Sequence, residues 1–272
     1  MLKLNYIIFL FCSSILLYSC SNNNLNSTKI IPTFQNEKEI KNKNKTSKIY
    51  FLGLALWGNG EEWSENDIID LEKIFRDVYF NRKFNSFIFS NKGIDSKNKL
   101  PYFSEKKLEI LIKNISDLIT EKDIIIITIS SHGFPGGVTY RIGITPSAPI
   151  LGDRIQEILR PIKENNILII ISSCYSGSLI DSLKGTNRII FTAASADKPS
   201  FGCDKESKNS WFIESLNESY YKHLNTKKRF SLKKWFNETK NIVKKKEERL
   251  GYPHSFPQIF IGKNANPFVF LL

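Results

Sequence analysis

Three unbroken runs of β-branched and other apolar residues constrain the fold of this chain more than any other feature. They occupy Asp123–Ile129, Ile167–Ile171 and Arg188–Ala193. Runs without apolar/polar alternation are typical of strands that are buried on both faces of a parallel sheet. Helical patterns lie between or after these runs. The sequence therefore predicts an α/β fold with a mostly parallel central sheet that helices cover.

The segment before these runs adds two strands and two helices. Ile49–Leu56 and Phe84–Phe89 have the composition and length of strands. Between them, Ser64 is predicted to cap a helix, with Asp67 three residues on as in a capping box. Ser104 is predicted to open the second helix. Its inward-facing residues are expected to be Leu108, Leu111, Ile112, Ile115 and Leu118.

The first nineteen residues have the pattern of a secretion signal. Lys3 supplies a positive charge, and Ile7–Leu17 is an apolar run of about eleven residues, short of the roughly 20 that span a membrane. The sequence Leu17-Tyr18-Ser19-Cys20 resembles a bacterial lipobox. This resemblance implies that Cys20 is lipid-modified and becomes the mature N-terminus. An ordinary cleaved signal with a chance cysteine is the alternative.

The chain therefore divides into a signal peptide (1–19), a flexible basic tether (20–47) and one globular domain (48–272). Two or more acyl chains hold a protein stably at a membrane surface. The expected location is the cell envelope, with the protein lipid-anchored and facing the periplasm or the surface. Ser21, which follows Cys20, gives no Asp retention signal and so favours the outer membrane where there is one.

The four cysteines argue against a disulfide scaffold and a zinc framework. Cys12 leaves with the signal and Cys20 is assigned to the lipid, so only Cys174 and Cys203 remain in the globular part. Structural zinc sites need about four clustered ligands. We therefore expect no metal, and no organic cofactor is implied.

The net charge of +12 is concentrated in two segments. Residues 21–48 hold six lysines and two glutamates, and residues 227–249 hold ten basic and three acidic residues. The second segment has the pattern of a helix whose basic residues form the solvated face. Its apolar face is expected to consist of Leu232, Trp235, Phe236, Ile242 and Val243. Binding of a nucleic acid or an envelope polymer is a third, less favoured hypothesis, and no nucleic-acid partner is expected.

Reactive residues follow two of the buried runs. The first run continues into Ser131-His132-Gly133 and the second into Ser173-Cys174-Tyr175. Sites in α/β sheets form beyond the carboxyl ends of the strands. A thiolate nucleophile with an imidazole to manage its proton is suited to acyl transfer. The N–H groups of Gly133 and Cys174 would face the developing oxyanion. A short helix through Gly177 and Leu179 is expected to favour the thiolate at its N-terminus.

Two other histidines compete for the role of base. His223 is predicted to lie at the surface near a helix end, and His254 lies in a loop between Pro253 and Ser255. Neither follows a buried strand, so His132 is preferred.

These blocks resemble the legumain (asparaginyl endopeptidase) family of cysteine peptidases. The resemblance rests on Ser131-His132-Gly133, on Ser173-Cys174-Tyr175-Ser176-Gly177-Ser178 about forty residues later, and on the Thr192–Cys203 block. Trp211–Glu214 resembles a helix start in which the family often has Asp, and Pro257–Phe260 resembles the closing strand of bacterial members. The resemblance implies a caspase-like three-layer sandwich from about Lys48 to the end of the chain.

The resemblance also assigns roles to individual residues. His132 becomes the general base or acid and Cys174 the nucleophile, with Gly133 and Cys174 N–H groups as the oxyanion hole. Ser172, Ser200 and Glu214 become candidate substrate-binding residues. Legumains have an acidic residue where this chain has Ser172, which puts cleavage after Asn in doubt.

The resulting hypothesis is an endopeptidase that hydrolyses peptide bonds through a thioester with a His/Cys dyad. Its partners are a peptide or protein substrate and, through the anchor, a membrane. The alternative is a catalytically silent surface lipoprotein that binds a partner. A Cys174–Cys203 disulfide would silence the enzyme, and the sequence leaves that pairing open.

Overall fold

The computed structural model describes residues 47–58, 60–92, 100–224 and 231–265. The predicted signal, Cys20 and all of the tether except Ser47 lie outside the described residues. Within the described part of the chain, no helix is both long and apolar enough to cross a bilayer.

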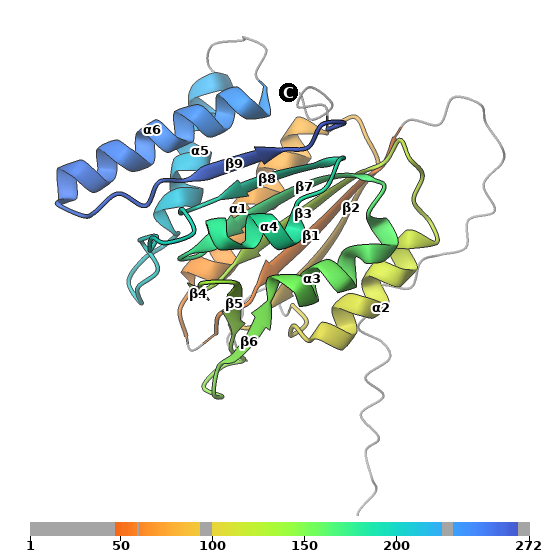
Figure 1. Cartoon of the computed structure of the whole chain (residues 1–272), viewed down its shortest axis with the longest axis horizontal. Helices are drawn as coiled ribbons and strands as arrows, with labels where there is room; N and C mark the ends of the chain where they lie inside the picture. Colours follow the sequence, from red (N-terminus) through yellow and green to blue (C-terminus); the bar gives the residue numbers. More distant parts are fainter. Residues whose placement is uncertain (1–46, 59, 93–99, 225–230, 266–272) are drawn as a thin grey trace, which may run out of the picture. The chain divides into compact units, whose positions relative to one another are not determined.

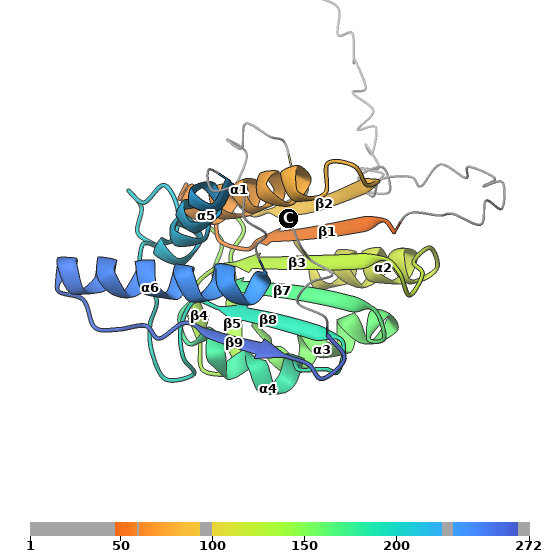
Figure 2. The ribbon, with the colours of Figure 1, turned by 90° about the horizontal axis from the view of Figure 1, so that it is seen from above.

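A six-stranded sheet forms the centre of the domain, in the order β2-β1-β3-β7-β8-β9. Figure 2 follows this order from one edge to the other. The first five strands are parallel, and β9 pairs antiparallel with β8. The strands span β1 (Ile49–Ala55), β2 (Phe84–Ser90), β3 (Ile124–Ser130), β7 (Asn166–Ser172), β8 (Arg188–Thr192) and β9 (Gln258–Ile261). The three apolar runs are thus interior strands, and the predicted mostly parallel sheet is confirmed.

Helices cover both faces of this sheet (Figure 1). One face carries α1 (Trp63–Val78), α5 (Trp211–Leu224) and α6 (Leu232–Leu250); the other carries α2 (Glu105–Ser116), α3 (Gly152–Leu159) and α4 (Ile180–Leu183). Short 3-10 turns, η2 (Arg160–Ile162) and η3 (Ser176–Leu179), flank α3 and α4. The fold is therefore the predicted three-layer α/β sandwich.

The α1/α5/α6 face contains a continuous apolar core. Alternate strand residues such as Phe51, Ile126 and Phe191 pack there with Phe212 and Trp235 of the helices. Because neighbouring residues of a strand point to opposite faces, the intervening isoleucines face α2, α3 and α4. Both sets are buried, which explains why the strands show no apolar/polar alternation.

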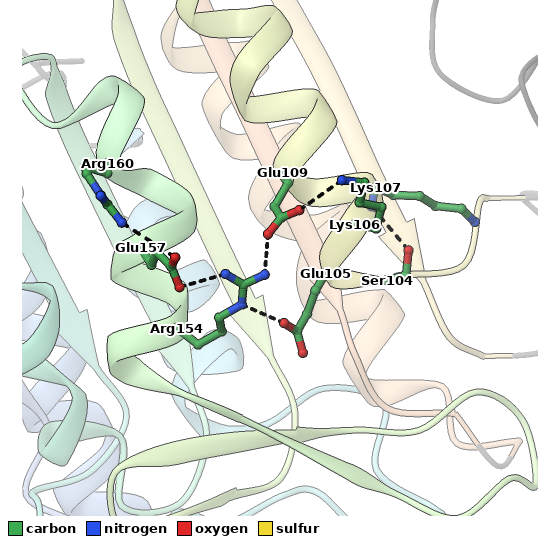
Figure 3. A network of polar contacts seen from close by, with 8 residues as sticks. All are labelled: Ser104, Glu105, Lys106, Lys107, Glu109, Arg154, Glu157 and Arg160. Carbon is green, nitrogen blue, oxygen red and sulfur yellow. Dashed lines mark hydrogen bonds and ion pairs between the residues drawn. The ribbon is translucent and has the colours of Figure 1, made fainter.

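On the other face, an ion-pair network joins α2 to α3 (Figure 3). The Arg154 guanidinium reaches Glu105 at 2.8 Å and Glu157 at 2.7 Å, and it also pairs with Glu109. Ser104 caps α2 as predicted, because its hydroxyl accepts a hydrogen bond from Lys107 N at 3.3 Å.

Two local predictions are wrong. Helix α1 begins at Trp63 with Glu62 as its N-cap residue, so Ser64 lies inside the helix. Its hydroxyl donates to Ser130 O at 2.7 Å instead of capping. Leu118 follows the end of α2 and is 42% exposed, so it is not part of the core.

A small antiparallel sheet, β4-β5-β6, is inserted after β3 and was not predicted. It comprises β4 (Gly133–Phe134), β5 (Gly137–Tyr140) and β6 (Ala148–Leu151). Its strands are too short for a periodic signal.

Candidate active site

The register of β3 and β7 brings the two predicted catalytic residues to the same edge of the sheet. Ser130 pairs with Ser172 at the ends of these adjacent parallel strands. His132 and Cys174 each follow two residues later. The pairing continues past the strands, because Ser131 N donates to Ser172 O at 3.1 Å.

His132 lies in an aromatic pocket. Its ring makes edge contacts with Trp57 at 4.3 Å and Trp63 at 5.3 Å between centroids. Thr139 N donates to the His132 carbonyl at 3.0 Å, which ties the residue to β5. Burial lowers the pKa of His132, and the charge of Glu61 only partly opposes this. The imidazole is therefore neutral near pH 7.

Cys174 lies beside Ser200, whose N–H and hydroxyl donate to the sulfur and whose carbonyl oxygen, at 3.4 Å, can accept from the thiol. Its sulfur is 3.3 Å from Ser200 N and 3.8 Å from Ser200 Oγ. The Cys203 thiol also hydrogen-bonds to it, and this contact is the main reason that the pKa of Cys174 is lowered to about 6; the Ser200 groups add to it. Cys174 is therefore mostly a thiolate near pH 7.

The predicted helix N-terminus is not the origin of this thiolate. Cys174 is followed by Tyr175 in a left-handed conformation, with a φ of 56°, and then by η3, a 3-10 turn of four residues. Hydrogen bonds from side chains and one backbone N–H take the place of the expected dipole. The sequence pattern could not show that hydrogen bonds replace the helix dipole, because Cys203 and Ser200 lie in a loop more than twenty-five residues further along the chain.

Gly133 lies directly against the backbone of the nucleophile. A Cβ at this position would be 2.3 Å from Cys174 O and 2.8 Å from Ser173 Oγ. Only glycine allows this approach. The room that the glycine leaves is used by Cys174 itself, and the assignment of the Gly133 and Cys174 N–H groups as oxyanion donors stays a prediction.

The three predicted substrate-binding residues lie at different depths. Ser200 contacts the Cys174 sulfur directly, as described above. Ser172 is 2% exposed, and its hydroxyl is 2.7 Å from that of Ser210, so it lies beneath the surface. Glu214 pairs with Lys246 at 2.5 Å.

Glu214 also lines a polar cavity of about 520 Å³ that was not predicted. Its other lining residues are Asp70, Ser207, Lys208, Asn209, Trp211, Asn217 and Tyr221. The lining includes neither Cys174 nor Ser200. Of the three predicted substrate-binding residues, Glu214 alone lines this cavity.

A buried polar network below the site was also missed. The Asp67 carboxylate accepts hydrogen bonds from Ser130 Oγ at 2.7 Å, Ser210 N at 2.9 Å and Asn209 Nδ2 at 3.3 Å. Burial outweighs these bonds and raises the pKa of Asp67 to about 7. The network joins α1, the end of β3 and the start of α5. The sequence indicated Asp67 only as a capping residue.

The two competing histidines are engaged elsewhere. His223 is 8% exposed and pairs with Glu238, so the prediction of a surface residue is wrong. His254 lies in a loop, and its Nδ1 is 3.2 Å from Glu247. Among the described residues, no group of three or more His, Cys, Asp or Glu side chains is arranged to hold a metal ion.

Comparisons with known proteins agree with this geometry. The sequence pattern of the peptidase C13 family matches residues 106–266. No curated protein matches the chain. Among solved structures, the crystal structure of caspase-1 from Spodoptera frugiperda is similar, with a TM-score of 0.53 and 12% identity over 80% of this chain and 86% of that one. That likeness shows the caspase-like fold.

Proposed function

The chain belongs to the peptidase C13 family, and we propose that this cysteine-type endopeptidase uses Cys174 as its nucleophile and His132 as its proton-transfer residue. The endopeptidase activity and a protein substrate follow from the family. The two named residues, the oxyanion donors and the membrane anchor are the parts proposed here.

The observation that carries the proposal is the pairing of Ser130 with Ser172. Adjacent parallel strands in this register deliver His132 and Cys174 to one edge of the sheet. The two side chains are also in contrasting states, with an ionised thiol and a neutral imidazole near pH 7. Such contrasting environments are typical of acid–base pairs in active sites.

The chemistry follows from these states. The Cys174 thiolate attacks the scissile carbonyl without a base, and a C–S bond forms as the oxyanion develops near the Gly133 and Cys174 N–H groups. The C–N bond then breaks, and the imidazole passes a proton that it takes from solvent to the departing amine. Neutral His132 next accepts a proton from the water that attacks the thioester; the C–S bond breaks, which frees the acid and restores the thiolate, and the imidazole returns its proton to solvent.

A peptide-library digest with matched variants tests this assignment. Cys174→Ala should reduce kcat/KM to background, and His132→Gln should reduce it by about 10²–10⁴-fold. The control is His254→Gln, which changes a histidine outside the proposed dyad and should keep most of the activity. Full activity of Cys174→Ala would refute the proposal and favour another nucleophile.

Ser200 and Glu214 are proposed to contribute to substrate selection, with Ser172 acting from beneath. Ser200 supports this through its contacts with the sulfur. Because Ser172 replaces the acidic residue of legumains, the digest should show no strong preference for Asn before the cleaved bond. Ser200→Ala should change KM or residue preference, and it should leave the free energy of unfolding nearly unchanged.

The proposed location is the cell envelope, with the domain tethered through lipid on Cys20. The support is the sequence Leu17-Tyr18-Ser19-Cys20 and the basic segment after it. Growth with a labelled fatty acid should label the wild-type chain and the control Cys12→Ser, but not Cys20→Ser. Equal labelling of Cys20→Ser would refute the anchor.

A further inference from the structure

The site contains a second thiol whose position the peptidase chemistry does not require. Cys203 hydrogen-bonds through its side chain to the Cys174 sulfur. Both residues are partly exposed and both are free thiols. Ser200, three residues before Cys203, places its N–H 3.3 Å from the same sulfur, so this loop lies over the nucleophile. A disulfide bond requires the two sulfur atoms to approach to roughly 2.05 Å.

The chain holds Cys203 near the nucleophile through the preceding segment. Tyr175 N donates to Lys198 O at 2.8 Å, which fastens residue 198 beside the end of β7. Trp211 N donates to Phe201 O at 3.0 Å and anchors the same segment to α5. Gly202 adopts a φ of +79° with no room for a Cβ, which would be 2.3 Å from Trp211 Cδ1. These contacts fix the path of residues 198–202, and this path places Cys203 beside Cys174.

The two thiols have opposite character. Cys174 is the thiolate, whereas the hydrogen bond to Cys174, burial and the Cys174 charge raise the pKa of Cys203 and keep it protonated. Cysteines that act as reversible oxidation sites combine a low-pKa, accessible thiolate with an adjacent resolving cysteine. Both parts of that arrangement are present here.

We propose that Cys174 is a reversible oxidation site for hydroperoxides and that Cys203 is its resolving cysteine. The proposal rests on the proposed function only for its consequence, which is that the disulfide switches off the nucleophile. The sulfur chemistry itself needs no peptidase activity.

The steps balance. The Cys174 thiolate attacks hydrogen peroxide; an S–O bond forms, the O–O bond breaks, and hydroxide leaves as water after it takes a proton. The neutral sulfenic acid no longer carries the charge that held the Cys203 proton. Cys203 then ionises to solvent and attacks the Cys174 sulfur; the S–S bond forms and the S–O bond breaks, releasing a second water. A dithiol reductant returns two electrons and two protons.

The test oxidises the reduced full chain, in which Cys12→Ser and Cys20→Ser remove the other thiols. After a few equivalents of hydrogen peroxide, intact mass should show the loss of two hydrogens. A non-reducing peptide map should show Cys174 linked to Cys203. Adding Cys203→Ser should instead give a gain of two or three oxygens, because sulfenic acid without a partner proceeds to irreversible acids.

Recovery of activity gives the second reading. After peroxide and then dithiothreitol, the Cys203-containing protein should regain most of its own starting activity. Cys203→Ser should recover about tenfold less of its own, since sulfinic and sulfonic acids resist dithiols. Equal irreversible oxidation of both proteins, or no linked peptide, would overturn the proposal.

The mass readout separates this proposal from the proposed function. A linked Cys174–Cys203 peptide together with full activity of Cys174→Ala would keep the oxidation site and reject the catalytic assignment. Loss of activity in Cys174→Ala without any linked peptide would do the reverse.

Discussion

Replacing Asp67 by asparagine should change how the stability of the protein depends on pH. Burial raises the pKa of this carboxyl to about 7 from its usual 3.8. Between these values the folded protein keeps a proton that the unfolded chain loses. The stabilising effect of the raised pKa is therefore complete below pH 4 and is lost as the pH rises toward 7.

The size of the effect follows from linkage. The free energy of unfolding falls by about 1.4 kcal/mol for each pH unit over which the folded state holds one extra proton. Over the interval set by the pKa of Asp67, the loss is on the order of 4 kcal/mol, a large part of the roughly 5–15 kcal/mol that stabilises a domain.

Asparagine reproduces the protonated form of Asp67. Oδ1 already accepts from Ser210 N and Asn209 Nδ2, whereas Oδ2 faces only Ser130 Oγ. The amide that replaces the carboxyl in Asp67→Asn can keep both acceptor contacts through its oxygen and donate to Ser130 Oγ through its nitrogen. The substitution thus keeps the network and removes the titration.

The assay is urea unfolding followed by the fluorescence of the tryptophans at several pH values from 4 to 7.5. The difference in unfolding free energy between Asp67→Asn and wild type cancels the other titrating groups. It should rise with pH by a few kcal/mol in favour of the variant. A flat difference, or one that falls, would refute the reasoning.

Asp70→Asn is the matched control. Asp70 lies on the same helix and accepts from Asn209 Nδ2 and Asn217 Nδ2 at 3.1 Å each, but it is only partly buried. The rise for Asp67→Asn should exceed that for Asp70→Asn. Equal changes would mean that the buried position has no special role.

Three further predictions concern the nucleophile, its glycine neighbour and a helix cap. Iodoacetamide should alkylate Cys174 about tenfold faster at pH 7 than at pH 5, because the pKa of Cys174 is lowered to about 6. Peptide mapping should show much slower labelling of Cys203. Equal labelling rates for the two cysteines would contradict the assignment. Gly133→Ala should lower kcat/KM, measured in substrate assays, by about a hundredfold, because the Cβ of the alanine would be 2.3 Å from Cys174 O. Unchanged kinetics would show that the close approach has no role. Ser104→Ala should reduce the free energy of unfolding in urea by about 1 kcal/mol, because Lys107 N loses its acceptor; a change no larger than that of Ser116→Ala, at an exposed hydroxyl in the last turn of the same helix, would argue against the cap.

The parts of this fold that the sequence predicted are those with strong local signals. The runs at Ile124, Ile167 and Arg188 are buried on both faces, so each is recognisable without its neighbours. The strand-end rule then placed His132 and Cys174 at one edge, because parallel neighbours end at the same side. The start of α1 was missed because Ser64 bonds to Ser130 O across the fold, a contact that overrides its local preference for capping.

The unpredicted parts of the site come from tertiary contacts. Trp57, which follows β1, and Trp63, which begins α1, both contact the His132 ring, and Cys203 reaches Cys174 from a loop nearly thirty residues away. No periodicity or spacing encodes such contacts. The strand-end rule, applied to β1 as well, would have indicated Trp57, which follows two residues after Ala55.

The pairing of β3 with β7 also sets the position of the two proposed catalytic groups relative to each other. A slip of one residue between these strands would displace one group by about 3.3 Å along the sheet and turn its side chain to the opposite face. That error exceeds the length of a hydrogen bond. The isoleucines from 124 to 129 and from 167 to 171 take no part in chemistry. Their packing nevertheless fixes the strand register, and the register determines how closely the imidazole and the sulfur can be positioned.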